Sequence, residues 1–143
     1  MFLNNLGVTY YNFGKIQKAT ELFESSLAIC LDIGDKLVES KTLSNLGLTY
    51  YNVGQSEKAI DYYKQSLAIK KYIGYRLGEC SALGNIGEAY SDLGQSEKAI
   101  NYYEQALSIS KEIGHRHSEG VWLGNLGIVF KDLGQSKKSD RLP

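Results

Sequence analysis

The fold is decided by the stretch NLGLTYYNVGQSEKAIDYYKQSLAIKKYI, residues 45–73, because related sequences recur before and after it. One asparagine of this stretch returns at a step of 40 residues, as Asn5, Asn45, Asn85 and Asn125. Two glycines keep the same step, as Gly7, Gly47, Gly87 and Gly127 and as Gly14, Gly54, Gly94 and Gly134. Self-similarity at a period of roughly 20 to 50 residues indicates a solenoid, in which each unit buries its apolar face against its neighbours.

Each period predicts two antiparallel helices of about 17 residues, because apolar residues recur at three- and four-residue spacing. In the first copy they run from Ala19 through Phe23 to Cys30. The only proline is the last residue, which suits an all-α chain. Gly34, Gly74 and Gly114 are expected as left-handed caps that end the second helix of a pair. Gly54, Gly94 and Gly134 are expected to break the chain between the two helices.

Polar residues predict how the helices begin. Asp35 can cap the first helix of the second pair, whereas Tyr75 and His115 at the equivalent sites are poorer caps, so their turns should be less firmly fixed. The second helix of each pair is expected to be capped by Ser56, Ser96 or Ser136. His115 and His117, although close to Glu119 in sequence, are expected as exposed turn residues and not as metal ligands.

Glycine inside a helix is destabilising by about 1 kcal/mol relative to alanine, so its recurrence in every first helix needs a reason. Close packing of the two helices supplies one. We therefore expect these glycines to face a small residue of the second helix, namely Ala19, Ala59 or Ala99.

The composition limits the classes of function. The 16 Lys and Arg balance the 16 Asp and Glu, so no overall field attracts nucleic acid or an anionic membrane. Cys30 and Cys80 form no Cys-x-x-Cys motif and occupy non-equivalent positions, which predicts ordinary thiols in a reducing compartment. Neither a signal peptide nor an apolar run of about 20 residues is present. A cytoplasmic protein that binds neither nucleic acid nor membrane is expected.

The spacing Leu43-x2-Leu46-Gly47-x2-Tyr50, followed by Ala59-x3-Tyr63, resembles the tetratricopeptide repeat. The third copy repeats the pattern as Leu83, Ile86, Gly87, Tyr90, Ala99 and Tyr103. The long unit and the missing helix-ending proline are similar to the repeats of spindle-orientation adaptors and kinesin light chain. The resemblance implies a right-handed α-solenoid of antiparallel helix pairs. The expected solenoid is a single array with repeats at 1–34, 35–74, 75–114 and 115–143. The first repeat is expected to lack its N-terminal part and the last its C-terminal part.

The resemblance further implies that the first helices line a concave groove for a peptide or helix of a partner protein. Asn5, Asn45, Asn85 and Asn125 fall on that face, and amides can pair with an extended backbone without reading its sequence. The alternative is that each asparagine bonds a neighbouring helix or turn. The groove residues expected to set specificity are Tyr11, Asn12, Leu48, Tyr51, Asn52, Glu88 and Asp92. The two carboxylates predict a ligand with a basic part.

No paired carboxylates, Ser-His-Asp set or Cys-His set supports catalysis, so we expect neither an enzyme nor a cofactor or metal. The last predicted helix, about residues 118–132, carries Trp122, Leu123, Leu126 and Phe130, and residues 135–143 are too few to cover it. This exposed face predicts a fragment of a longer array or a chain that covers its end by self-association. The second hypothesis is therefore a self-associating structural or regulatory segment, a homo-oligomer through helix 118–132.

Overall fold

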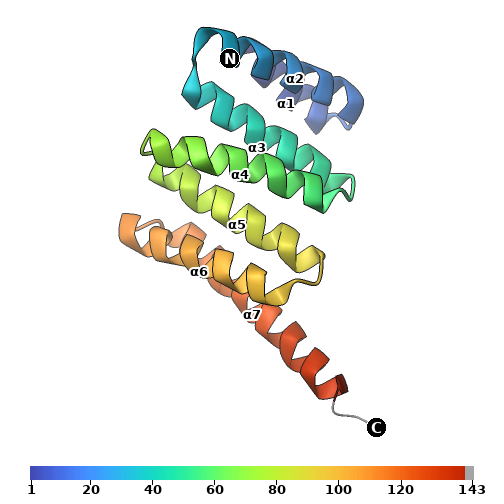
Figure 1. Cartoon of the computed structure of the whole chain (residues 1–143), viewed down its shortest axis with the longest axis vertical. Helices are drawn as coiled ribbons and strands as arrows, with labels where there is room; N and C mark the ends of the chain where they lie inside the picture. Colours follow the sequence, from blue (N-terminus) through green and yellow to red (C-terminus); the bar gives the residue numbers. More distant parts are fainter. Residues whose placement is uncertain (141–143) are drawn as a thin grey trace. The chain divides into compact units, whose positions relative to one another are not determined.

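The computed structural model describes residues 1–140 of the chain and the side chains of residues 1–135, and this part forms helices without any strand (Figure 1). The seven helices are α1 (Phe2–Asn12), α2 (Ile16–Ile33), α3 (Lys36–Asn52), α4 (Ser56–Tyr72), α5 (Arg76–Asp92), α6 (Ser96–Ile113) and α7 (Arg116–Asp140). We call α1, α3, α5 and α7 the A-type helices and α2, α4 and α6 the B-type helices. The predicted all-α helical repeat fold is confirmed.

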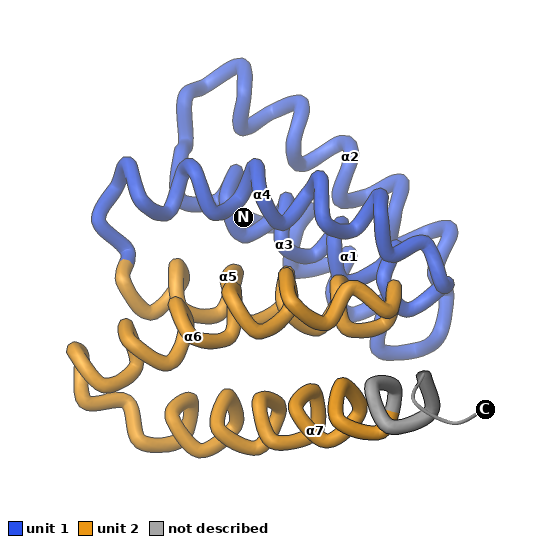
Figure 2. Tube along the Cα trace, turned by 60° about the horizontal axis from the view of Figure 1, so that its bottom comes forward, with its two compact units in different colours: residues 1–75 blue, residues 76–143 orange. Residues whose placement is uncertain are grey.

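The chain divides into two compact units (Figure 2). Unit 1, Met1–Tyr75, contains α1 to α4, and unit 2 begins at Arg76 and contains α5 to α7. In unit 1, α1 packs on α2, α2 on α3 and α3 on α4. In unit 2, α5 packs on α6 and α6 on α7. Each A-type helix from α1 to α5 is thus covered by the B-type helix that follows it.

The turns confirm some expected caps and correct others. Gly34 and Gly114 end α2 and α6 at φ values of 74° and 69°, as predicted for left-handed caps. Asp35 caps α3, because its Oδ1 accepts the Val38 N–H at 3.1 Å. The prediction that His115 is a poorer cap is wrong: its Nδ1 accepts the Ser118 N–H at 3.2 Å. A neutral imidazole presents the same kind of acceptor as a carboxylate oxygen.

The serines predicted to cap the B-type helices do not do so. Helices α4 and α6 begin at Ser56 and Ser96, preceded by Gln55 and Gln95 as N-caps without a side-chain capping hydrogen bond. The serines are therefore already helical residues, one position past the place where a hydroxyl can cap. The Ser136 side chain lies outside the described residues.

Gly134 does not break the chain, contrary to expectation, because α7 continues through it to Asp140. A turn at this position is stable only if the following segment packs back on the A-type helix. In α4 that packing uses Ala59 and Tyr63, which are both buried. The equivalent positions after Gly134 are Ser139 and Pro143. Without an apolar face to bury, the backbone continues its helix.

The glycines inside α1 and α3 mark close contacts, as predicted, but the partner is different. A Cβ built on Gly7 would lie 2.6 Å from the Phe23 ring, and one on Gly47 would lie 2.6 Å from the Tyr63 ring. Phe23 and Tyr63 are among the most buried side chains of unit 1. The glycines therefore receive an aromatic ring four residues after the alanine that we expected them to face.

Candidate peptide-binding surface

The predicted binding residues of unit 1 come from two A-type helices that contact each other, α1 and α3. Asn5 and Asn12 of α1 and Leu48 and Asn52 of α3 are exposed. Tyr11, Asn45 and Tyr51 are half-buried. Every predicted member in this unit thus has a side chain that solvent can reach.

Two hydrogen bonds connect α1 and α3 through residues of the predicted surface. The Asn52 side-chain amide donates to the Tyr11 hydroxyl. The Asn45 amide donates through Nδ2 to Asn4 Oδ1 at 3.0 Å. The second bond is the contact with a neighbouring helix that the alternative interpretation expected, and it uses one N–H group of Asn45. The second N–H and the oxygen of the Asn45 amide take no part in this bond.

Asn4 is a residue that sequence reasoning missed. It is buried, and its Oδ1 also accepts from Thr42 Oγ1 at 3.1 Å, so it holds both Thr42 and Asn45 of α3. The only signal in the sequence is a polar residue directly before the recurring asparagine. The signal is only partly preserved: Ser44 keeps a polar residue at this site in the second copy, whereas Gly84 and Gly124 occupy it in the later copies.

Unit 2 contains the other two ladder asparagines, Asn85 and Asn125, both half-buried, and the exposed carboxylates Glu88 and Asp92 of α5. Three of these residues, Glu88, Asp92 and Asn125, influence the hydroxyl of Tyr103. Burial raises the pKa of the Tyr103 hydroxyl most, the charges of Glu88 and Asp92 raise it further, and a hydrogen bond with the Asn125 side chain lowers it. Glu88, Asp92 and Asn125 therefore all lie close enough to Tyr103 to influence its hydroxyl.

A buried lysine, Lys70 of α4, lies beside α3 and was not anticipated. Lys70 Nζ donates to Ser44 Oγ at 2.8 Å, Ser44 is 2.7 Å from Ser66 Oγ, and Ser66 donates to the Ser40 carbonyl at 2.7 Å. Burial, and then the positive charge of Lys41, lowers the pKa of Lys70 to about 8. The cluster supplies α3 with a polar anchor in place of purely apolar packing.

Stacked tyrosines fasten the A-type to the B-type helix near the turn in both units. Tyr50 and Tyr62 stack with ring centroids 5.4 Å apart, and Lys58 Nζ lies 4.2 Å from the Tyr50 centroid. Tyr90 and Tyr102 repeat this arrangement at 5.5 Å in unit 2. Such contacts are worth about 0.5 to 1.5 kcal/mol beyond the area they bury, so they help to hold the surface rigid.

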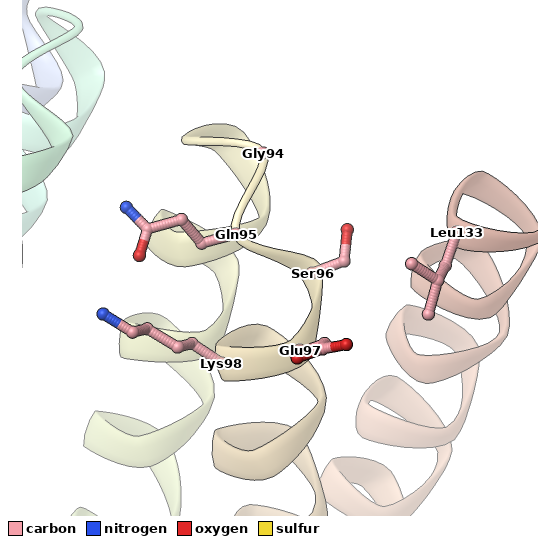
Figure 3. Close-up of a pocket in the computed structure, with 6 residues that line it drawn as sticks. All are labelled: Gly94, Gln95, Ser96, Glu97, Lys98 and Leu133. Carbon is pink, nitrogen blue, oxygen red and sulfur yellow. The ribbon is translucent and has the colours of Figure 1, made fainter. Parts of the chain in front are cut away.

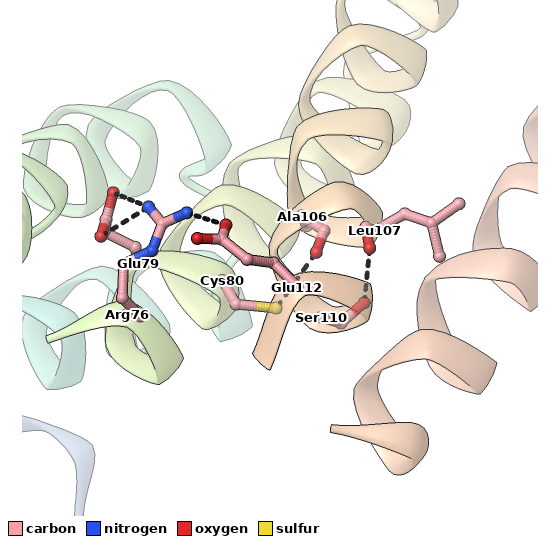
Figure 4. Close-up of polar contacts among 7 residues, drawn as sticks. All are labelled: Arg76, Glu79, Cys80, Ala106, Leu107, Ser110 and Glu112. Carbon is pink, nitrogen blue, oxygen red and sulfur yellow. Dashed lines mark hydrogen bonds and ion pairs between the residues drawn. The ribbon is translucent and has the colours of Figure 1, made fainter. Parts of the chain in front are cut away.

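At the other end of unit 2, polar contacts hold α5 on α6 (Figure 4), and one more joins α5 to α7. The Arg76 guanidinium bonds both oxygens of Glu79 at 3.1 Å and also reaches Glu112 on α6. Buried Cys80 donates its thiol to the Ala106 carbonyl at 3.3 Å and accepts from Trp122 Nε1 at 3.2 Å. This cysteine has a packing role that its sequence position did not reveal.

A hollow at the start of α6 contains no predicted binding residue. Its lining is Gly94, Gln95, Ser96, Glu97, Lys98 and Leu133. Ser96 and Glu97 point toward Leu133 of α7, whereas Gln95 and Lys98 point to the opposite side of the helix (Figure 3). Since its polar groups do not converge, the hollow does not form a site for a small molecule.

Within residues 1–135, no three His, Cys, Asp or Glu side chains gather in a way that could hold a metal ion. No helix in the described part combines the length and the apolar character that crossing a bilayer requires.

Comparison with known proteins supports the repeat assignment. The tetratricopeptide repeat family model matches residues 1–71 and 78–142. None of the curated proteins compared with the chain matches it. The structure of BtubC (BKLC) from P. vanneervenii is similar, with a TM-score of 0.86 and 23% identity over 96% of this chain. That match covers 57% of BtubC, so the chain spans little more than half of that protein.

Two further structures are similar. The TPR-like repeats of a kinesin light chain-like protein from Podosopora anserina align with a TM-score of 0.77 and 21% identity, over 95% of this chain and 67% of that one. The TPR2AB domain of yeast Sti1, in its complex with pHSP90, aligns with a TM-score of 0.81 and 20% identity, over 99% of this chain and 50% of that one. At these identities the likeness establishes a shared fold.

Proposed function

Because the chain belongs to the tetratricopeptide repeat family, we propose that it is a protein-interaction module that binds a peptide or helix of a partner protein along its A-type helices. The family generally consists of scaffolds and not of enzymes. The Sti1 complex with pHSP90 gives one example of a similar fold that engages a protein ligand. The observation that carries the proposal is the accessible surface of amide, tyrosine and leucine side chains that α1 and α3 present together.

The chemistry of this surface suggests what the ligand contains. The amides of Asn45 and Asn85 can pair with backbone groups of an extended segment, while Leu48 adds an apolar contact. Glu88 and Asp92 favour a basic side chain, and they should make association slower at high salt. We therefore propose a ligand with an apolar part and a basic part.

The proposal is tested by selecting peptides from a displayed library against the whole chain and measuring their affinity by calorimetry. Changing both Asn45 and Asn85 to Ala should abolish binding while helical content and the melting temperature stay the same. Glu88→Gln should weaken the basic peptides selectively. Asn101→Ala is the matched control, because Asn101 is an exposed amide on α6 whose Oδ1 accepts a hydrogen bond from its helix neighbour Gln105.

Unchanged affinity after the double substitution would refute the role of the asparagines. Loss of helicity in the same variant would instead show that these amides are structural. Chemical-shift changes on a peptide titration distinguish the surfaces, since binding elsewhere would move resonances of the B-type helices and leave those of Asn45 and Asn85 in place.

We also infer a cytoplasmic site of action. The inference is supported by Cys30 and Cys80, which are both free and buried. Unpaired thiols of this kind are typical of a reducing compartment. The balanced charge still predicts that the module binds neither nucleic acid nor a membrane surface. This prediction would be contradicted if the chain shifted nucleic acid in an electrophoretic mobility assay, or floated with lipid vesicles, at physiological salt.

A further inference from the structure

Helix α7 differs from the other A-type helices of residues 36–135 in how one face is covered. The face consists of Gly120, Leu123, Gly127 and Phe130, at helical spacing. Leu123 is 50% exposed, whereas Leu43 and Leu83 at the equivalent positions of α3 and α5 are each 2% exposed. Phe130 is 52% exposed, whereas Tyr90 at the equivalent position is 9% exposed. In α3 and α5 this face is buried by the following B-type helix.

Gly127 identifies what this face is shaped to receive. A Cβ on the equivalent Gly47 would lie 2.6 Å from the Tyr63 ring, and one on Gly87 would lie 3.0 Å from the Tyr103 ring. A Cβ on Gly127 meets no atom within 4 Å. Glycine destabilises a helix by about 1 kcal/mol relative to alanine. Gly127 therefore destabilises α7 without the aromatic contact that its equivalents Gly47 and Gly87 make.

We infer that the face formed by Gly120, Leu123, Gly127 and Phe130 binds an amphipathic helix of a partner that carries the spacing Ala-x-x-aromatic-aromatic. The B-type helices of this chain show the required pattern at residues 59–63 and 99–103, AIDYY and AINYY. The second aromatic ring of the partner packs over Gly127, as Tyr63 does over Gly47. The first aromatic ring stacks on Phe130, as Tyr62 does on Tyr50 at 5.4 Å.

The partner helix is not one that a second folded copy of residues 1–135 can supply. In the described structure, α4 and α6 are the helices with this pattern, and each already packs on its own A-type helix. A second copy would have to detach one of them before it could cover α7. That step exposes rings such as Tyr63 and Tyr103, which are buried in the folded chain.

The probe is an amidated, acetylated peptide of residues 96–113, SEKAINYYEQALSISKEI, labelled for fluorescence anisotropy and added to the whole chain. Saturable binding is expected in the micromolar range, because an isolated helix of this length must first order. The same peptide with Tyr103→Ala should bind at least about tenfold more weakly, since it lacks the ring that fits Gly127.

The protein variant Gly127→Gln places a side chain where the ring must lie, and should also weaken binding about tenfold or more. It should remain folded, because the site is open. Ile128→Gln is the matched control: Ile128 is 59% exposed on the same helix but outside the proposed face, so its loss should leave affinity unchanged.

Absence of binding up to millimolar peptide would overturn the inference, as would equal effects of Gly127→Gln and Ile128→Gln, which would indicate nonspecific apolar contact. Sedimentation velocity over a concentration series tests the other occupant. A dimer that Gly127→Gln dissociates would show that a second copy covers α7 and would overturn the assignment to a separate partner helix.

Discussion

Replacing Gly47 by alanine should destabilise the chain, although alanine is the better helix former. The new Cβ would lie 2.6 Å from Cδ1 and Cε1 of Tyr63, closer than real Cβ atoms approach a neighbour. Tyr63 is 2% exposed, so its ring has no free space to move into. Alanine contributes about 1 kcal/mol of helix propensity. Overpacking a well-filled core destabilises by about 1 to 3 kcal/mol, so the net loss should be about 1 kcal/mol.

Gly127→Ala separates the two contributions, because its Cβ meets nothing within 4 Å. This variant should gain up to about 1 kcal/mol from propensity alone. Gly87→Ala, at 3.0 Å from Tyr103, should fall between the two. The measurement is urea unfolding followed by circular dichroism, with equal m-values required before free energies are compared. If Gly47→Ala stabilises the chain as much as Gly127→Ala does, the ring contact is not what selects glycine.

Three further predictions concern polar groups. The pKa of Lys70 is about 8 in the folded chain and 10.5 in its ordinary state, so the unfolded chain binds more protons between these two pH values. The free energy of unfolding should therefore rise with pH in this range. Urea unfolding at a series of pH values should show this rise in the natural chain and not in Lys70→Met. His115→Ala should lose about 1 kcal/mol of stability as the α7 cap disappears, whereas His117→Ala should be neutral in the same thermal melts. Asn4→Ala leaves the donors of Thr42 and Asn45 without their acceptor and should lower the free energy of unfolding by about 1 to 3 kcal/mol; an unchanged melting temperature would contradict the anchoring role.

The helices and most of their ends could be predicted from the sequence because the repeat states them several times. A glycine at the same place in every copy indicates a shared backbone requirement, and Gly34 and Gly114 do adopt the left-handed conformation. The choice between Ala59 and Tyr63 as the partner of Gly47 could not be made, because both lie on the same helix face. Which atom reaches the glycine depends on the direction of a side chain and not on spacing.

Features that occur once were the ones that escaped prediction. No other copy has an asparagine at the position of Asn4 or a lysine at the position of Lys70, so periodicity could not single them out. Gly134 looked like Gly54 and Gly94, but a turn depends on what packs after it. The cap formed by His115 required knowing which nitrogen faces the Ser118 N–H. The groove residues themselves remain a prediction from the family's geometry.

The contact between Trp122 and Cys80 gives unit 2 its own optical signal. Trp122 is the only tryptophan in the chain, it is 8% exposed, and its indole nitrogen lies 3.2 Å from a thiol sulfur. Its fluorescence should shift to the red when α7 separates from α5, whereas circular dichroism reports helix loss in both units. Following both signals through one denaturation would reveal whether units 1 and 2 melt as a single cooperative body or one after the other, as repeat arrays can.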